Sequence, residues 1–152
     1  MNRHLAALLG TAVALLAACG PRGPRPIALG AESCGHCHMT IADPRFTAEA
    51  ISTTGKITAF DDVGCLAAWL GENSAPVAST WVTSFVDRRN WLSADSAVYL
   101  RTDSLRTPMA SGLIALRPGH EADSVRSVMS GSLLSWREVL STPHAHQPSD
   151  SR

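Results

Sequence analysis

The stretch that sets the order of elements in this chain is residues 46–62, FTAEAISTTGKITAFDD. Its first seven residues alternate between two faces as a strand does, and residues 53–55 make a polar turn that ends on glycine. Residues 56–60 return as a second strand, so the stretch predicts an antiparallel hairpin. Asp61 is a good helix N-cap and Asp62 is favourable in a first helical turn, so we expect a helix next.

The rest of the chain repeats this order of elements. The first helix should run to about Leu70, and residues 80–86 should form the third strand. Residues 87–95 are mostly polar and turn-like. The strand, strand, helix, strand order then recurs at 97–101, 112–116, 121–129 and 133–136. Neither half, about 46–86 or about 97–136, could bury a good core alone, so the sequence predicts an α+β fold in which two similar ββαβ units pack into one compact domain.

A cluster of potential metal ligands lies before the hairpin, at residues 34–41, CGHCHMTI. It places two thiols, two imidazoles and a thioether within six residues, closer together than a core would need. Thiolate and thioether are the ligands that Cu(I) prefers. In an extended loop, Cys37 and Met39 would project to the same side and could chelate one ion, and Cys34 could join them across the turn at Gly35 and His36.

Both ends of the chain predict segments outside the domain. The first 18 residues have a basic start and an apolar run that is too short for a comfortable membrane span, which indicates a signal peptide. The run ends in Leu16-Ala17-Ala18-Cys19, which resembles a bacterial lipoprotein processing box, so we expect Cys19 to be lipidated and to anchor the protein to a membrane. The expected division is a tether over 19–31, the domain over 32–140 and a disordered tail over 141–152.

The composition excludes several classes of protein. If Cys19 carries lipid, three thiols remain, and Cys34, Cys37 and Cys65 cannot all pair within one chain, which argues against a disulfide scaffold. The chain has 13 basic and 13 acidic side chains, so no basic field suggests nucleic acid. Nothing resembles a catalytic triad, a phosphate loop or a carboxylate pair for acid–base work, so we do not expect an enzyme.

Together these motifs resemble the NosL family, the accessory lipoproteins of nitrous oxide reductase. The resemblance rests on a lipoprotein signal and on motifs that cover most of the remaining chain: Cys-x-x-Cys-x-Met-x-Ile at 34–41 with Asp43 and Arg45-Phe46, then Gly55-Lys56, Phe60-Asp61-Asp62-x-Gly64-Cys65-Leu66, and Thr107-Pro108-Met109 before a strand led by Gly112.

The resemblance implies a copper chaperone that binds Cu(I), is anchored to a membrane on the periplasmic side, and supplies copper in denitrification. Its partner would be a recipient cuproenzyme or its assembly machinery, namely the nitrous oxide reductase system. The resemblance also adds Met109 to the ligands, although a gap-filling core methionine is the commoner use of this residue. Our predicted metal ligands are Cys37, Met39, Cys34 and Met109, with His38 and Cys65 ranked behind them.

Other metal chemistries stay open from the residues alone. His38 stands where the family usually has a small residue, and it completes Cys34-x-x-Cys37-His38, the attachment motif of c-type haem, although the strand-rich remainder offers no helices to wrap a haem. The three thiols plus a histidine would make a structural Cys3His zinc site, with Cys65 contributed from near the helix start.

Several residues have a second interpretation. A Cys34–Cys37 disulfide would disable the copper site until it was reduced. Cys65 can also be a small buried hydrophobe, and Asp61 and Asp62 favour helix capping over metal ligation. The tail holds His144-x-His146, a spacing at which two imidazoles can chelate a metal.

Overall fold

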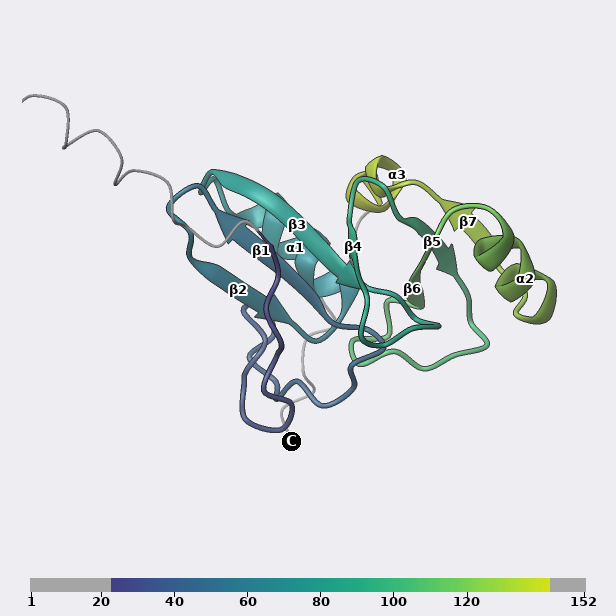
Figure 1. The fold of residues 1–152 in the computed structure, drawn as a ribbon, viewed down its shortest axis with the longest axis horizontal. Helices are drawn as coiled ribbons and strands as arrows, with labels where there is room; N and C mark the ends of the chain where they lie inside the picture. Colours follow the sequence, from purple (N-terminus) through teal and green to yellow (C-terminus); the bar gives the residue numbers. More distant parts are fainter. Residues whose placement is uncertain (1–22, 143–152) are drawn as a thin grey trace, which may run out of the picture.

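The computed structural model describes residues 23–142, which form two antiparallel sheets and three helices (Figure 1). The predicted signal peptide, Cys19 and the pair His144 and His146 lie outside these residues. Between residues 23 and 142, no helix has the length and apolar character needed to cross a membrane.

The first unit lies at the left of Figure 1 and the second at the right. The first unit consists of β1 Ala48–Ser52, β2 Ile57–Phe60, α1 Val63–Glu72 and β3 Val77–Thr83, extended by β4 Trp91–Ser93. The second consists of β5 Val98–Arg101, β6 Leu113–Leu116, α2 His120–Val128 and β7 Ser132–Leu134, followed by α3 Trp136–Ser141.

The two sheets share one topology. Their strand orders are β2-β1-β3-β4 and β6-β5-β7, so in each unit the first strand is central, its hairpin partner lies on one side, and the strand after the helix lies on the other. All neighbouring pairs are antiparallel. This arrangement confirms the predicted α+β fold of two similar ββαβ units.

The structure corrects several predicted boundaries. β3 begins three residues before the expected Thr80 because Ile51 of β1 pairs with Ser79 and, across a β-bulge, Ser52 pairs with Val77. β4 replaces the expected turn, since only residues 87–90 turn back and the following Trp91 pairs with Thr83. β7 ends at Leu134 instead of Trp136 because Ser135 caps α3 through a capping box with Glu138.

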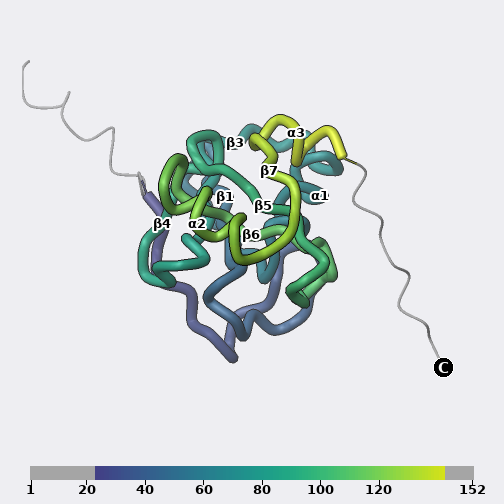
Figure 2. The backbone as a smooth tube through the Cα atoms, turned by 90° about the vertical axis from the view of Figure 1, so that its right-hand side faces the viewer, coloured from purple at the N-terminus to yellow at the C-terminus, as the bar shows by residue number. Residues whose placement is uncertain are grey.

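One hydrophobic cluster joins the two units. It includes Phe60 and Leu66 from the first unit and Tyr99, Leu113 and Trp136 from the second. The tilted rings of Tyr99 and Trp136 pack together with their centroids 5.3 Å apart. Figure 2 looks along the long axis of the molecule, and the second unit lies in front of the first in this view. The shared core explains why the chain folds as one domain.

Residues 25–32 fold back against the first unit. The backbone N–H of Arg25 donates to Glu49 Oε2 at 3.0 Å, and the Arg25 guanidinium binds the Glu32 carboxylate. Ile27 packs against the shared core, and the Gly30 N–H donates to the Ile41 carbonyl at 2.9 Å. This part of the segment that we expected to be a flexible tether therefore contacts the domain.

Candidate metal centre

The loop at residues 33–41 is a closed turn, held by an isolated bridge between Ser33 and Thr40. The Cys34 N–H donates to the Met39 carbonyl at 2.8 Å, and the His38 N–H donates to the Cys34 carbonyl at 3.1 Å. His38 has a φ of 62°, in the left-handed region. The expectation of an extended loop is therefore wrong, because the chain turns back at His38.

Gly35 fixes this turn against β2. Its N–H donates to the Ala59 carbonyl at 2.8 Å. A Cβ added at Gly35 would lie 2.3 Å from Thr58 Cγ2, so a larger residue would force the loop away from the sheet. The glycine therefore allows the loop to lie directly on the strand that leads into Asp61.

The junction between β2 and α1 faces the same loop. Asp62 is the N-cap of α1, with its side chain accepting from the Gly64 N–H at 2.6 Å, so the expectation that Asp61 caps this helix is wrong by one residue. Asp61 is the last residue before the cap and is 3% exposed. Cys65 lies in the first turn of the helix and is also 3% exposed.

Four side chains converge where the loop meets this junction. The Sγ atoms of Cys34, Cys37 and Cys65 and a carboxylate oxygen of Asp61 all lie within 4.8 Å of one another. The Cys37 thiol lies 3.5 Å from both carboxylate oxygens of Asp61. Cys34, Asp61 and Cys65 are buried, and Cys37 is half-buried. The group therefore has one side toward the surface and could hold a metal ion.

The three thiols do not ionise alike. The Cys65 thiol donates a hydrogen bond to Cys34, and the backbone N–H groups of Asp61 and His36 add to it, so the pKa of Cys34 falls to about 6 despite burial. Burial raises the pKa of Cys37 to about 12, and the neighbouring Cys34 and Asp61 charges add to this increase. Its hydrogen bond to Cys34, together with burial, raises the pKa of Cys65. The cluster therefore holds one thiolate readily and resists a second unless a cation enters.

The two methionines lie differently. Met39 is 53% exposed, on the same closed loop as Cys34 and Cys37. Met109 is half-buried and packs against the core cluster that includes Cys34 and Cys65. Its backbone N–H donates to Asp62 Oδ2 at 3.1 Å, so the cap residue of α1 also holds the loop that carries Met109. The structure thus brings the loop of Met109, the predicted ligand from the second unit, beside the helix that carries Cys65.

The histidines of the motif are outside the four-residue group. His38 is exposed. His36 Nε2 lies 3.3 Å from the Glu72 carboxylate, at the far end of α1. The fourth group beside the thiols is therefore Asp61, whereas the zinc hypothesis assigned this position to a histidine. The sequence pattern favoured helix capping for Asp61, and the signal for a role at the site was its place in one motif with Cys65.

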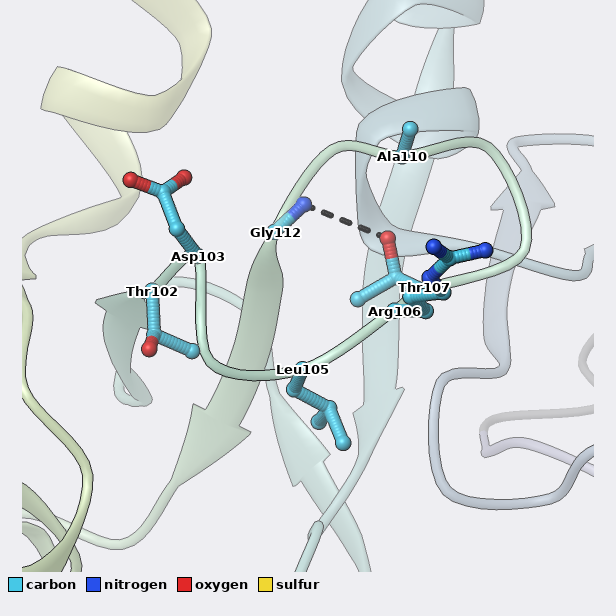
Figure 3. Close-up of a pocket in the computed structure, with 7 residues that line it drawn as sticks. All are labelled: Thr102, Asp103, Leu105, Arg106, Thr107, Ala110 and Gly112. Atoms are coloured by element: carbon cyan, nitrogen blue, oxygen red, sulfur yellow. Dashed lines mark hydrogen bonds between the residues drawn. The ribbon is translucent and has the colours of Figure 1, made fainter.

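A separate hollow of about 410 Å³ opens in the loop between β5 and β6 (Figure 3). The Gly112 N–H donates to Thr107 Oγ1 at 3.2 Å across the base of this loop, as the dashed line in the figure shows. Met109 is not among the residues that line the hollow. They are Thr102, Asp103, Leu105, Arg106, Thr107, Ala110 and Gly112.

Comparisons with known proteins agree with this fold. The family model for NosL matches residues 26–143. No curated protein matches the chain. Among solved structures, the crystal structure of the copper chaperone NosL from Shewanella denitrificans is similar with a TM-score of 0.65 and 17% sequence identity, covering 76% of this chain and 94% of that chain. At this identity, the structural likeness establishes a shared fold.

Proposed function

Because this chain belongs to the NosL family, we propose that it is a copper chaperone that binds Cu(I) as cargo and is not an enzyme. The similar structure from Shewanella denitrificans is described as a copper chaperone. The observation that carries the proposal is the convergence of Cys34, Cys37 and Cys65 at one point. Cu(I) is a soft ion that favours thiolate and thioether ligands at low coordination number.

The burial of the thiol groups favours copper over haem. Covalent haem would need the sulfurs of Cys34 and Cys37 to face a porphyrin beside His38. Cys34 is 1% exposed and its sulfur points to Cys65 and Asp61, whereas His38 is on the surface. A small ion fits between these sulfurs without moving Cys34 out of the core.

The arrangement also suggests how the ion is handed over. We assign Cys34 and Cys37 as primary ligands, with Cys65 beside them and with Met39 and Met109 as uncharged thioether ligands around them. A thioether holds Cu(I) and releases it by ligand exchange. Met39, which is 53% exposed, is the first donor that a recipient could replace.

A competition titration of the reduced protein against a chromophoric Cu(I) chelator tests the ligand set. We expect Cys37→Ser and Met39→Ala each to weaken Cu(I) binding at least about tenfold, which corresponds to about 1.4 kcal/mol. Met129→Leu is the matched control, because Met129 packs against a separate hydrophobic cluster that includes Leu100 and Ile114 and none of the three thiols. Wild-type affinity in both site variants would refute the assignment.

The membrane anchor is tested by fractionating cells. The predicted processing box leads us to propose that Cys19 is lipidated and holds the chaperone on the periplasmic side of a membrane. Cys19→Ala should move the protein to the soluble fraction, since the acyl chains supply the membrane affinity. Continued membrane association of this variant would argue against the lipid anchor.

The recipient that we propose is nitrous oxide reductase or its assembly machinery, on the basis of the family resemblance. Cells that lack this chain should then accumulate nitrous oxide reductase with reduced copper content, measured on the purified enzyme. Full copper loading in those cells would assign the chaperone to another exported cuproenzyme.

A further inference from the structure

We propose that one face of the first sheet lies against the lipid headgroups of the membrane and meets them through Trp81 and Trp91. This outer face is the side of the sheet opposite α1, and it carries Glu49, Trp81, Thr83 and Trp91. The inference rests on the lipidation of Cys19 in the proposed function, and it adds which surface of the domain the bilayer contacts. It does not depend on the cargo.

The register of the first sheet places both tryptophans on the outer face. Trp81 pairs directly with Glu49 of β1, and Trp91 of β4 pairs with Thr83, which follows Trp81 by two residues along β3. Partners in an antiparallel pair share a face, as do residues two apart in one strand. Val82 points the other way, since it is fully buried in the core cluster that includes residues of α1. The core therefore closes the α1 side, and the two tryptophans lie on the opposite side.

The expected point of lipid attachment lies close to the outer face. The backbone N–H of Arg25 donates to Glu49 Oε2 at 3.0 Å, so the first described residues lie over this face of β1 (Figure 1). Four peptide steps lead from Gly23 back to Cys19, and a chain of this length spans at most about 14 Å. Because residues 25–32 fold against the domain, the tether is much shorter than the expected 19–31. Acyl chains on Cys19 therefore bring the outer face to the membrane surface.

The two side chains suit the headgroup region. Trp81 and Trp91 are both half-buried, and neither is among the side chains that pack against the hydrophobic clusters of the described chain. The indole N–H of Trp81 donates to Ser79 Oγ at 3.0 Å, two positions along the strand, which keeps the ring on the outer face. Tryptophan is enriched at membrane–water interfaces because its ring is apolar and its N–H is polar. Trp69 differs, since it packs against the shared core with its ring centroid 5.5 Å from that of Phe60.

The test uses the lipidated full chain in vesicles of phosphatidylethanolamine and phosphatidylglycerol, with and without a phosphatidylcholine that carries a nitroxide on its headgroup. The nitroxide quenches fluorescence only from tryptophans that lie close to the headgroups. We expect it to remove at least about a quarter of the wild-type emission, and Trp81→Phe combined with Trp91→Phe to abolish most of that loss. Trp69→Phe is the matched control, because Trp69 lies in α1, and it should leave the quenched emission unchanged.

The outcomes separate this inference from the lipid anchor. Wild-type protein that floats with the vesicles but is not quenched, or a double variant that is quenched like the wild type, overturns the membrane contact of the outer face while the anchor stands. Wild-type protein that does not float with the vesicles overturns the anchor, and this inference with it. Dimerisation of soluble Cys19→Ala that is lost on adding Trp81→Glu would assign the outer face to a second copy of the chain and overturn the inference.

The single variants decide if the double variant does not fold, as judged by circular dichroism. Trp81→Phe and Trp91→Phe should then each lose part of the quenching, because both rings lie on the outer face. Quenching that is unchanged in both single variants overturns the inference.

Discussion

At the scale of single residues, Glu49 carries an electrostatic cost for the fold. It lies on the central strand β1 with no exposure, and its Oε1 atom has no hydrogen-bond partner in the described chain. Burial raises its pKa, although the N–H and the charge of Arg25 oppose the increase. A carboxyl whose pKa is higher in the folded state destabilises the fold as pH rises from the unfolded pKa through the folded one.

Glu49→Gln should therefore raise the free energy of unfolding at neutral pH by about 1 kcal/mol, because a neutral amide avoids the desolvation cost of a buried carboxylate. Below the pKa that Glu49 has in the unfolded protein, this gain in unfolding free energy should vanish. Glu49 of the wild type is then protonated in both the folded and the unfolded state. Urea unfolding at pH 4 and pH 7 measures both parts, with the exposed Asp103→Asn as control. Equal gains at the two pH values would show that the charge is not the cause.

The sequence predicted which residue types form the site better than it predicted how they come together in space. Cys34 and Cys37 were evident because they are close in the chain, and their motif indicates soft ligands. Asp61 was assigned to helix capping and Cys65 was ranked behind the other ligands, because local patterns cannot show that α1 begins beside a loop more than 20 residues upstream. The adjacent Asp61 and Asp62 look equivalent in sequence, yet one faces the thiols and the other caps the helix.

At the scale of elements, the start of α1 depends on close contact with the loop before β6. A Cβ added at Gly64 would lie 2.7 Å from Ser111 Cβ and 3.0 Å from Asp62 Oδ1. The same Asp62 carboxylate caps the helix and binds the Met109 N–H, so a shift of α1 here would disturb both. The absence of a side chain at Gly64 thus lets the helix that carries Cys65 pack closely against the loop that carries Met109.

Gly64→Ala should lower the free energy of unfolding by about 2 kcal/mol through this overpacking. Gly71→Ala is the matched control, because it lies on the same helix with nothing within 4 Å of the added Cβ. The control should stabilise the protein by about 0.5–1 kcal/mol, since alanine has the higher helix propensity. Denaturant midpoints measure the pair, and a similar effect at both positions would contradict the close contact.

Element types were predictable where the pattern was local, and element ends were less so. The hairpin of β1 and β2 follows from alternation and a glycine turn. β4 was missed because three residues carry too little pattern, and their pairing with β3 is what makes them a strand. The early start of β3 likewise depends on β1 and its bulge, which are remote in sequence.

At the scale of the whole molecule, the two units have the same topology but one core. Leu113 from β6 is fully buried in the cluster that also contains Cys34 and Cys65. A cavity made in the second unit therefore removes packing from the first, where the candidate metal centre lies. The repeated element order was visible in the sequence, but the face along which the units join is set by tertiary contacts that no local pattern records.

Leu113→Ala should lower the free energy of unfolding by about 2–5 kcal/mol, the usual cost of a buried leucine cavity. Because the core is shared, the denaturant midpoint from far-UV circular dichroism should coincide with the midpoint at which the Cys34 and Cys65 thiols of the metal-free protein become open to alkylation. Val128→Ala is the matched control, since Val128 is 85% exposed on α2 and its truncation should change stability by less than about 0.5 kcal/mol. Thiol exposure that keeps the wild-type midpoint while the circular dichroism midpoint falls would mean that the first unit holds its own core, and would contradict a single cooperative domain.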